Sequence, residues 1–445
     1  MSTSTTTKGE LRNQWKNPAD VLSLLLLIGG DIVQKAIAQM VGSISLTPVA
    51  FSFGWIAYGF SQLMSVVGDG RLLPAPEQSA ILVNCANGFE RSNSSWMLDR
   101  LLRDHEIRAH INEEEDSIRV DLFEVGPLQQ PRPDRIWWLG WITIFAEIGI
   151  VVIPWVIDRD WGPMLIVLSG TLLAAATCYL PQWTKEKWAG RLLSKDNVLC
   201  LTRGNGHKYI MVLIGSKGSP DLETFATARG SPCSETPYVT VLLAILWIFL
   251  LISVIGLKAN AWYIVGAGGL GMIQNVSAAG ATRSSSTTGL QLSRFERMPT
   301  ITGKSKHFED DTDAEVDLNQ ASRDVLPLKE WVGPQEARRS IMPAWLTSMK
   351  REDGAPEWLE PVKTTDRIIR VHGALKELEK WVPGAGLAMI KIFFPTRLEY
   401  GDGNGRDKIN KKFWKRAWYT VGVRRQAEQA RRYAREGVAS EAKSV

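Results

Sequence analysis

The sequence predicts an α-helical membrane bundle of about six transmembrane helices in three hairpins, with small cytosolic α+β segments. The first observation is that the apolar residues of the 445-residue chain gather in six windows, separated by polar and charged segments. A bilayer core of about 30 Å needs roughly 20 apolar residues per helix, and the windows approach that length. The second observation is that Lys and Arg alternate between rich and poor segments. Both patterns are typical of a multi-pass membrane protein.

The first two windows occupy residues 21–68 and are separated only by residues 42–45. So short a turn suffices to bring a second helix back across the membrane, which predicts a hairpin here. An alternative is that the first window is a cleaved signal peptide, since residues 36–38 (Ala-Ile-Ala) resemble a cleavage site. Asp31, Gln34 and Lys35 argue against it, because they would make the leader unusually polar.

Four further windows form two more pairs, at residues 136–157 with 164–180 and at 239–257 with 261–279. Tryptophans bracket the third window, as expected for side chains that favour the headgroup zone. The segments that precede the first, second and third hairpins carry three, eight and eight basic residues, respectively. The turn within the first hairpin carries no basic residue, and the turns within the second and third carry one each, Arg159 and Lys258. The positive-inside rule then predicts an integral membrane protein with both termini in the cytosol.

The connecting segments look folded. Residues 80–84 and 117–125 have strand character and 95–110 helical character, while 198–202 and 209–214 flank an Asn-Gly turn typical of a β-hairpin. The two loops are expected to pair into one α+β layer. The predicted organisation is a cytosolic N-terminus (1–18), transmembrane hairpins (19–68, 136–180 and 239–279), a cytosolic α+β loop (69–135), a cytosolic loop with a β-hairpin (181–238), a flexible Ser/Thr-rich and acidic linker (280–324), and a cytosolic C-terminal helical region with a basic tail (325–445).

Polar residues inside the windows are the candidate functional residues. Asp31 and Lys35 share a helix face beside Gln34, and Glu147 stands alone in the third window, with Asn275 and Gln274 of the last window as plausible partners. Ionisable groups at membrane depth usually face the bundle interior or a wet cavity. A substrate or proton site and a purely structural polar clamp are both consistent with this pattern.

The remaining motifs give weaker evidence of function. Residues 266–271 match the glycine spacing of a dinucleotide-binding loop, but their flanks are apolar windows, so close helix packing explains the glycines better. The spacing of the four cysteines and five histidines predicts neither a metal site nor a disulfide framework, and no catalytic or cofactor motif is present. A net charge of +5 argues against a nucleic-acid binder. The basic tail from Arg406 to Arg435, interleaved with aromatic residues, could lie on an anionic lipid leaflet or be a solvated helix.

Several runs together resemble a family: NPADVLSLLLLIGGDIVQKAIAQ, LTRGNGHKYIMV and GGLGMIQN. The chain resembles a group of uncharacterised multi-pass integral membrane proteins of filamentous fungi, over residues 17–279. The resemblance implies a eukaryotic membrane location and assigns no site residues. We therefore expect a non-enzymatic membrane component or scaffold in contact with the lipid bilayer, with homo-oligomerisation as a further expectation. The alternative is a small-solute or proton-coupled transporter that uses Asp31, Lys35 and Glu147.

Overall fold

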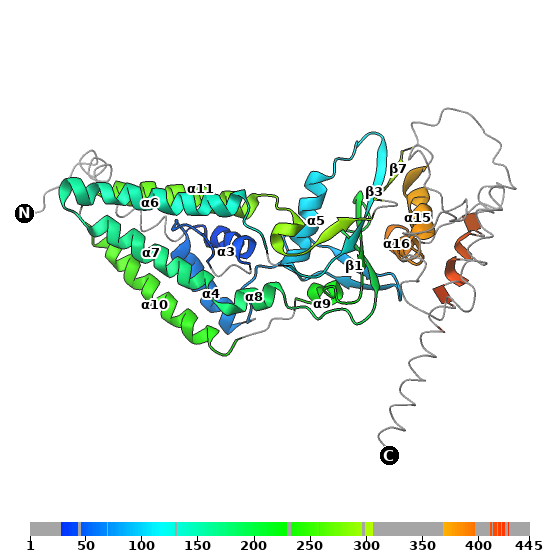
Figure 1. Ribbon diagram of the computed structural model, residues 1–445, viewed down its shortest axis with the longest axis horizontal. Helices are drawn as coiled ribbons and strands as arrows, with labels where there is room; N and C mark the ends of the chain where they lie inside the picture. Colours follow the sequence, from blue (N-terminus) through cyan, green and yellow to red (C-terminus); the bar gives the residue numbers. More distant parts are fainter. Residues whose placement is uncertain are drawn as a thin grey trace, which may run out of the picture. The chain divides into compact units, whose positions relative to one another are not determined.

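The computed structural model in Figure 1 describes residues 28–42, 46–68, 70–129, 131–228, 233–257, 259–295, 299–305 and 368–396, and part of the stretch 410–426. The chain divides into two compact units, each built from segments distant in sequence. Unit 1 comprises residues 1–75, 129–189 and 228–290, and unit 2 comprises residues 76–128, 190–227 and 291–445.

The predicted six-span helical bundle is wrong. The protein is an α+β structure with a seven-stranded mixed sheet. Within the described residues, two helices are long and apolar enough to cross a membrane, α6 (Arg135–Asp158) and α10 (Thr236–Ile255). The pair α7 (Gly162–Cys178) and α8 (Pro181–Lys187) is bent by 43° and would be a third crossing only if it is one broken span.

The largest difference between prediction and structure is at the first predicted hairpin. In place of two long helices the chain has two short ones, α3 (Gly30–Met40) and α4 (Trp55–Val67), of 11 and 13 residues. At 1.5 Å per residue they measure about 17 and 20 Å, too short for a bilayer core. Residues 21–27, the first part of the predicted window, lie outside the described residues. The last predicted helix is present as α11 (Ala261–Gly280), but its glycines and amides lower its hydropathy.

Unit 1 is a layered helical body. Helix α6 packs along α11, and α7 packs along α10, while α3 and α4 lie between these pairs (Figure 1). Helix α6 begins with a side-chain cap, since the Asp134 carboxylate accepts the Trp137 N–H at 3.0 Å. It ends at Arg159, which adopts a left-handed backbone conformation. A short 3-10 helix, η1 (Ser285–Thr288), follows α11.

Unit 2 is built on the sheet. Its strands are β1 (Ile81–Asn84), β2 (Phe89–Ser92), β3 (Asp116–Val125), β4 (Asn197–Thr202), β5 (Tyr209–Gly215), β6 (Leu292–Arg294) and β7 (Thr300–Lys304). Their order is β2-β1-β4-β5-β3-β6, with β7 also paired to β3. Only β3 and β5 run parallel, and the other pairs are antiparallel. The strands predicted from both loops therefore do join one sheet.

Helices cover both faces of this sheet. Because side chains alternate along a strand, Val120 and Leu122 of β3 point to one face and Asp121 and Phe123 to the other. The first face packs against α15 (Arg370–Trp381) and α16 (Ala385–Phe393). The second face meets α5 (Trp96–Arg108), whose His105 contacts Asp121 and Phe123. Burial on both sides explains the continuous apolar run of β5. The short helix α9 (Leu222–Ala226) completes the unit.

The C-terminal parts differ from expectation in two respects. Strands β6 and β7 and the 3-10 helix η1 occupy part of the predicted flexible linker, of which residues 296–298 and 306–324 lie outside the described residues. In the basic tail, the apolar side chains Phe413, Trp414, Ala417 and Val421 are buried in the core of unit 2 instead of facing outward. Most of the tail is not described, so contact with anionic lipid stays a prediction.

Candidate functional site

The candidate site is built around residues 46–54, which belong to no helix or strand and lead into α4 inside unit 1; we call them the extended stretch. Pro48 has no backbone N–H and disfavours a helical conformation at Thr47, so the preceding helix cannot continue here. Helix α4 starts only after Gly54, whose φ of 92° is accessible to glycine at little cost. Apart from Leu46, the stretch is buried or half-buried. It is therefore non-helical backbone in the interior of an apolar helical body.

Glycines on the surrounding helices make room for this stretch. Four of them approach it closely: Gly140 of α6, Gly170 of α7, and Gly268 and Gly271 of α11. A Cβ on Gly271 would overlap both the Phe51 carbonyl oxygen and Glu147 Oε1. A Cβ on Gly268 would lie 2.7 Å from the Phe53 ring. Gly268 and Gly271 thus serve close packing, as predicted, but their partner is the extended stretch, and a Cβ on Gly266 would meet no atom within 4 Å.

Side chains of α11 provide hydrogen bonds for the stretch. Gln274 Oε1 accepts the Ala50 N–H at 3.4 Å, and Asn275 Nδ2 donates to the Ala50 carbonyl at 3.4 Å. Asn275 Nδ2 also donates to Ser52 Oγ at 2.6 Å, and Trp55 Nε1 donates to the Ala50 carbonyl at 2.9 Å. Buried backbone groups outside secondary structure require such partners, so these side chains hold the stretch in place.

Glu147 of α6 faces the same stretch. Its side chain is fully buried, and the Phe51 N–H approaches its carboxylate. Neither carboxylate oxygen makes a hydrogen bond of ordinary geometry within the described part of the chain. We call Ser52, Glu147, Gln274 and Asn275 the polar centre. All four are 2% exposed or less.

The candidate residues predicted from the sequence do not all lie at one site. Glu147 and Asn275 meet at the polar centre through residues 50–52. Asp31 is exposed in the first turn of α3, and Lys35 is half-buried one turn later. Gln34 Nε2 donates to the Leu72 carbonyl at 2.9 Å. These three residues therefore have surroundings quite different from the fully buried polar centre.

Sequence reasoning missed Ser52 and the extended stretch. The available signals were the Thr47-Pro48 pair and Gly54 within an apolar window, because Pro ends a preceding helix and Gly commonly borders one. Gln274 was identified only as a partner for Glu147. It bonds instead to the backbone of Ala50.

A second buried polar group holds the C-terminal end of α3. Lys187 Nζ donates to the carbonyls of Ala38 and Gln39, at 2.8 and 3.3 Å, and to that of Val41. Arg283 bonds to the Gln39 carbonyl and, at 2.7 Å, to Asp134. The last carbonyls of a helix lack intrahelical partners and carry partial negative charge, so two cations stabilise this end. The arrangement is structural and fixes a helix that ends inside unit 1.

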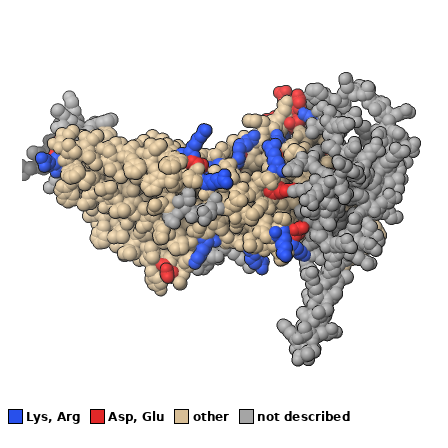
Figure 2. All heavy atoms as spheres, in the orientation of Figure 1, with Lys and Arg blue, Asp and Glu red and all other residues tan. Residues whose placement is uncertain are grey.

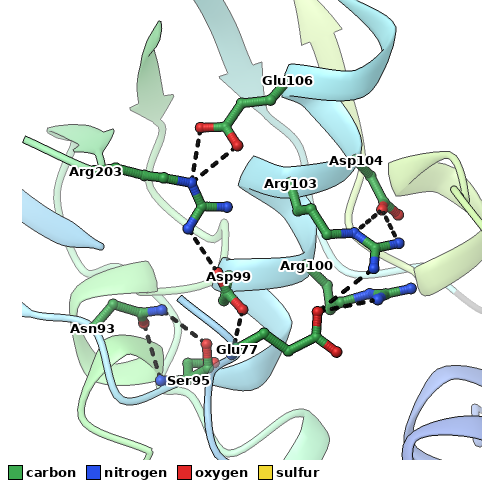
Figure 3. A network of polar contacts seen from close by, with 9 residues as sticks. All are labelled: Glu77, Asn93, Ser95, Asp99, Arg100, Arg103, Asp104, Glu106 and Arg203. Atoms are coloured by element: carbon green, nitrogen blue, oxygen red, sulfur yellow. Dashed lines mark hydrogen bonds and ion pairs between the residues drawn. The ribbon is translucent and has the colours of Figure 1, made fainter. Parts of the chain in front are cut away.

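Unit 2 contains a separate charged network, shown in Figure 3. Arg203, in the loop between β4 and β5, lies between two carboxylates of α5. Its Nε donates to Glu106 at 2.9 Å, and one terminal nitrogen donates to Asp99 at 3.1 Å. Asp99 Oδ2 also accepts the Glu77 N–H at 2.7 Å. The bonds of Arg203 to both carboxylates tie the β4–β5 loop to α5, and we assign the network a structural role.

Asn93 begins a glycosylation sequon, but its side chain is buried. Its Nδ2 donates to the Ser95 carbonyl at 2.9 Å, and its Oδ1 accepts the Ser95 N–H at 3.0 Å. Both polar atoms of the side chain are therefore engaged within the fold.

The chain was compared with protein-family models, curated proteins and solved structures, and nothing matched in any of the three.

Proposed function

We propose that the protein is an integral membrane component in which unit 1 is embedded in the bilayer and unit 2 is a water-facing α+β domain that offers interaction surfaces. The observation that carries this proposal is the large apolar surface of unit 1. Only 28% of the apolar window of α6 and 33% of that of α10 is buried within the protein. Apolar patches of this extent on a protein surface mark contact with a membrane or another protein.

The distribution of charge favours a membrane over a protein partner. Between Arg135 and Asp158, Glu147 is the single charged residue of α6, and it points inward; α7, α10 and α11 have none. Figure 2 shows almost no Lys, Arg, Asp or Glu over α6, α7 and α10, whereas charged side chains appear at the two ends of these helices. At 1.5 Å per residue, α6 and α10 measure about 36 and 30 Å, which matches a bilayer core. The buried or half-buried position of residues 47–54 also fits, because non-helical backbone is tolerated at membrane depth only inside protein or beside water.

Charge substitution on the outer face of α10 tests this proposal. Phe249 and Ile252 are 60% and 59% exposed, so the double change Phe249→Lys and Ile252→Lys alters surface chemistry without disturbing a core. Each Lys near the middle of a membrane helix costs about 2.5–3.5 kcal/mol on insertion scales, so we expect loss of the alkali-resistant membrane fraction. The matched control is Phe89→Lys on β2 of unit 2, where a 51% exposed Phe should be replaceable without effect on membrane association.

The opposite result would refute the membrane assignment. If unit 1 faces water, the same two lysines would break up an exposed apolar patch and increase the yield of soluble protein. The two assignments thus predict opposite effects of the lysines, loss of the alkali-resistant membrane fraction or a higher yield of soluble protein.

A second candidate function is proton-coupled transport through unit 1. The observation that favours it is the buried carboxylate of Glu147 without an ordinary hydrogen bond. Asp31 and Lys35, the other members of the predicted set, are not part of the polar centre. Proton flux into proteoliposomes should therefore disappear in Glu147→Gln and persist in Asp31→Asn, and equal flux in wild type and Glu147→Gln would rule out this function.

Homo-oligomerisation and the cytosolic location of both termini stay predictions. The resemblance to fungal membrane proteins supports neither a substrate nor a partner.

A further inference from the structure

The polar centre has more oxygen acceptors than hydrogen-bond donors. Three buried acceptors have no hydrogen bond within the described residues: Glu147 Oε1, Glu147 Oε2 and Asn275 Oδ1. The Phe51 carbonyl oxygen lies beside Glu147 Oε1, since both would overlap one added Cβ on Gly271. The one side-chain donor of the polar centre left unpaired is Gln274 Nε2. Buried acceptors are normally satisfied, so this imbalance requires an explanation.

One face of α11 and the Glu147 side chain both meet the chain at residues 50–52. Gly271, Gln274 and Asn275 are three and four residues apart, so they lie on the same face of the helix. That face contacts the extended stretch, and Asn275 fixes it through Ala50 and Ser52. The carboxylate of α6, the amide oxygen of α11 and the Phe51 carbonyl therefore come from three separate elements of unit 1.

A buried carboxylate in an apolar interior is either neutralised by a proton or compensated by a positive charge. The buried cations of unit 1 within the described ranges, Lys187 and Arg283, are engaged at the C-terminal end of α3 and with Asp134. Calcium usually takes six to eight oxygen ligands, several of them charged, whereas this centre has one carboxylate. One negative charge beside amide and carbonyl oxygens matches a monovalent cation instead.

We propose that Glu147, Asn275 Oδ1 and the Phe51 carbonyl bind a monovalent metal cation of the sodium type, in competition with a proton on Glu147. This inference rests on the proposed membrane location of unit 1. Non-helical carbonyls together with polar side chains form cation sites of this kind within membrane-embedded proteins. The glycine at 271 keeps the space beside Glu147 Oε1 and the Phe51 carbonyl oxygen free of a side chain.

The test is direct binding of ²²Na⁺ to the purified full chain in detergent, with N-methylglucamine as the replacement cation, between pH 6 and 9. We expect saturable binding that weakens as the pH falls, because protons compete for the carboxylate. Glu147→Gln should abolish saturable binding, and Asn275→Ala should weaken it at least tenfold. Asp31→Asn, which removes an exposed carboxylate of the same unit, should bind like wild type.

Glu147→Gln conserves shape and removes a buried charge, and its folding is checked by size-exclusion profile and helical circular dichroism. A folded Glu147→Gln protein that binds ²²Na⁺ like wild type would overturn the proposal. If that variant does not fold, ²²Na⁺ binding to the wild-type protein is the test. Absence of saturable binding to wild type at every pH would overturn the proposal equally. Failure here leaves the alkali-resistance result unchanged, so a wrong cation site is distinguishable from a wrong membrane assignment.

Discussion

Substitution of Gly271 by alanine should destabilise unit 1, whereas the same change at Gly266 on the same helix should not. An added Cβ at Gly266 would meet no atom within 4 Å. At Gly271 it would overlap the Phe51 carbonyl and Glu147 Oε1. The carbonyl belongs to backbone that Gln274 and Asn275 hold through the neighbouring residues, so it cannot rotate away as a flexible side chain would.

The magnitude follows from two opposing effects. Alanine is favoured over glycine inside a helix by about 1 kcal/mol, and this gain applies to both variants. Forcing an extra methyl group into a filled interior costs about 1–3 kcal/mol, and this cost applies at Gly271 alone. Gly268→Ala should fall between the two, because its obstacle is the Phe53 ring, which is half-buried and can shift.

The assay is thermal unfolding in detergent, followed by intrinsic tryptophan fluorescence at one fixed scan rate, since such unfolding is often irreversible. For a unit of this size, each kcal/mol shifts the midpoint by roughly 2–4 °C. We expect Gly271→Ala to unfold on the order of 5 °C below Gly266→Ala, with Gly268→Ala between them. Equal midpoints for all three variants would refute the close packing of the extended stretch against α11.

Three further predictions concern unit 2. Burial raises the pKa of Asp121, but hydrogen bonds from His105, Arg119 and Thr300 outweigh it and hold the pKa at about 2, below the ordinary 3.8. The carboxylate therefore contributes about 2 kcal/mol of stability above pH 4 that is lost as the pH falls toward 2, and Asp121→Asn should flatten this acid dependence in chemical unfolding. Arg203→Ala leaves the buried Asp99 without its cation and should cost about 3–5 kcal/mol, whereas Arg108→Ala on the exposed side of α5 should cost less than 1; equal losses in urea titrations would contradict the network. Glu379→Ala removes the carboxylate that accepts the N–H groups of Gly384 and Leu387 at the start of α16, so hydrogen exchange there should accelerate, and unchanged exchange would argue against a capping role.

The parts of unit 2 that local sequence determines were predictable. The strand at residues 117–125 alternates in a way that matches β3, and the Asn-Gly turn lies between β4 and β5 as expected. Within the predicted C-terminal helical region, α15 is a helix whose Leu375 and Leu378 are buried in the core of unit 2. Strands β6 and β7 were not recognised, because they are short, polar in part and stabilised mainly by pairing with β3, which a local pattern does not reveal.

The candidate site was predictable only in part. Glu147 and Asn275 were identifiable because a polar group in an apolar window is costly and must face inward. Asp31 fulfilled the same criterion but is exposed, because α3 is short and its first turn lies at the surface. Ser52 carried no signal of its own, since its importance comes from the non-helical backbone around it.

Hydropathy failed at the first hairpin for a physical reason that also explains the site. A sum of side-chain transfer energies over residues 21–68 does not depend on the backbone conformation. A non-helical apolar stretch therefore has the same hydropathy as a helix of the same composition. In a low-dielectric interior the extended backbone must find hydrogen-bonding partners, and α11 supplies them through Gln274 and Asn275. Those amides, with the glycines that admit the stretch, are the same features that reduce the hydropathy of α11. Gln274 and Asn275, two of the residues that lower the hydropathy of α11, are therefore also members of the polar centre, so tests of function in this chain should begin at residues 50–52 and the α11 face that contacts them.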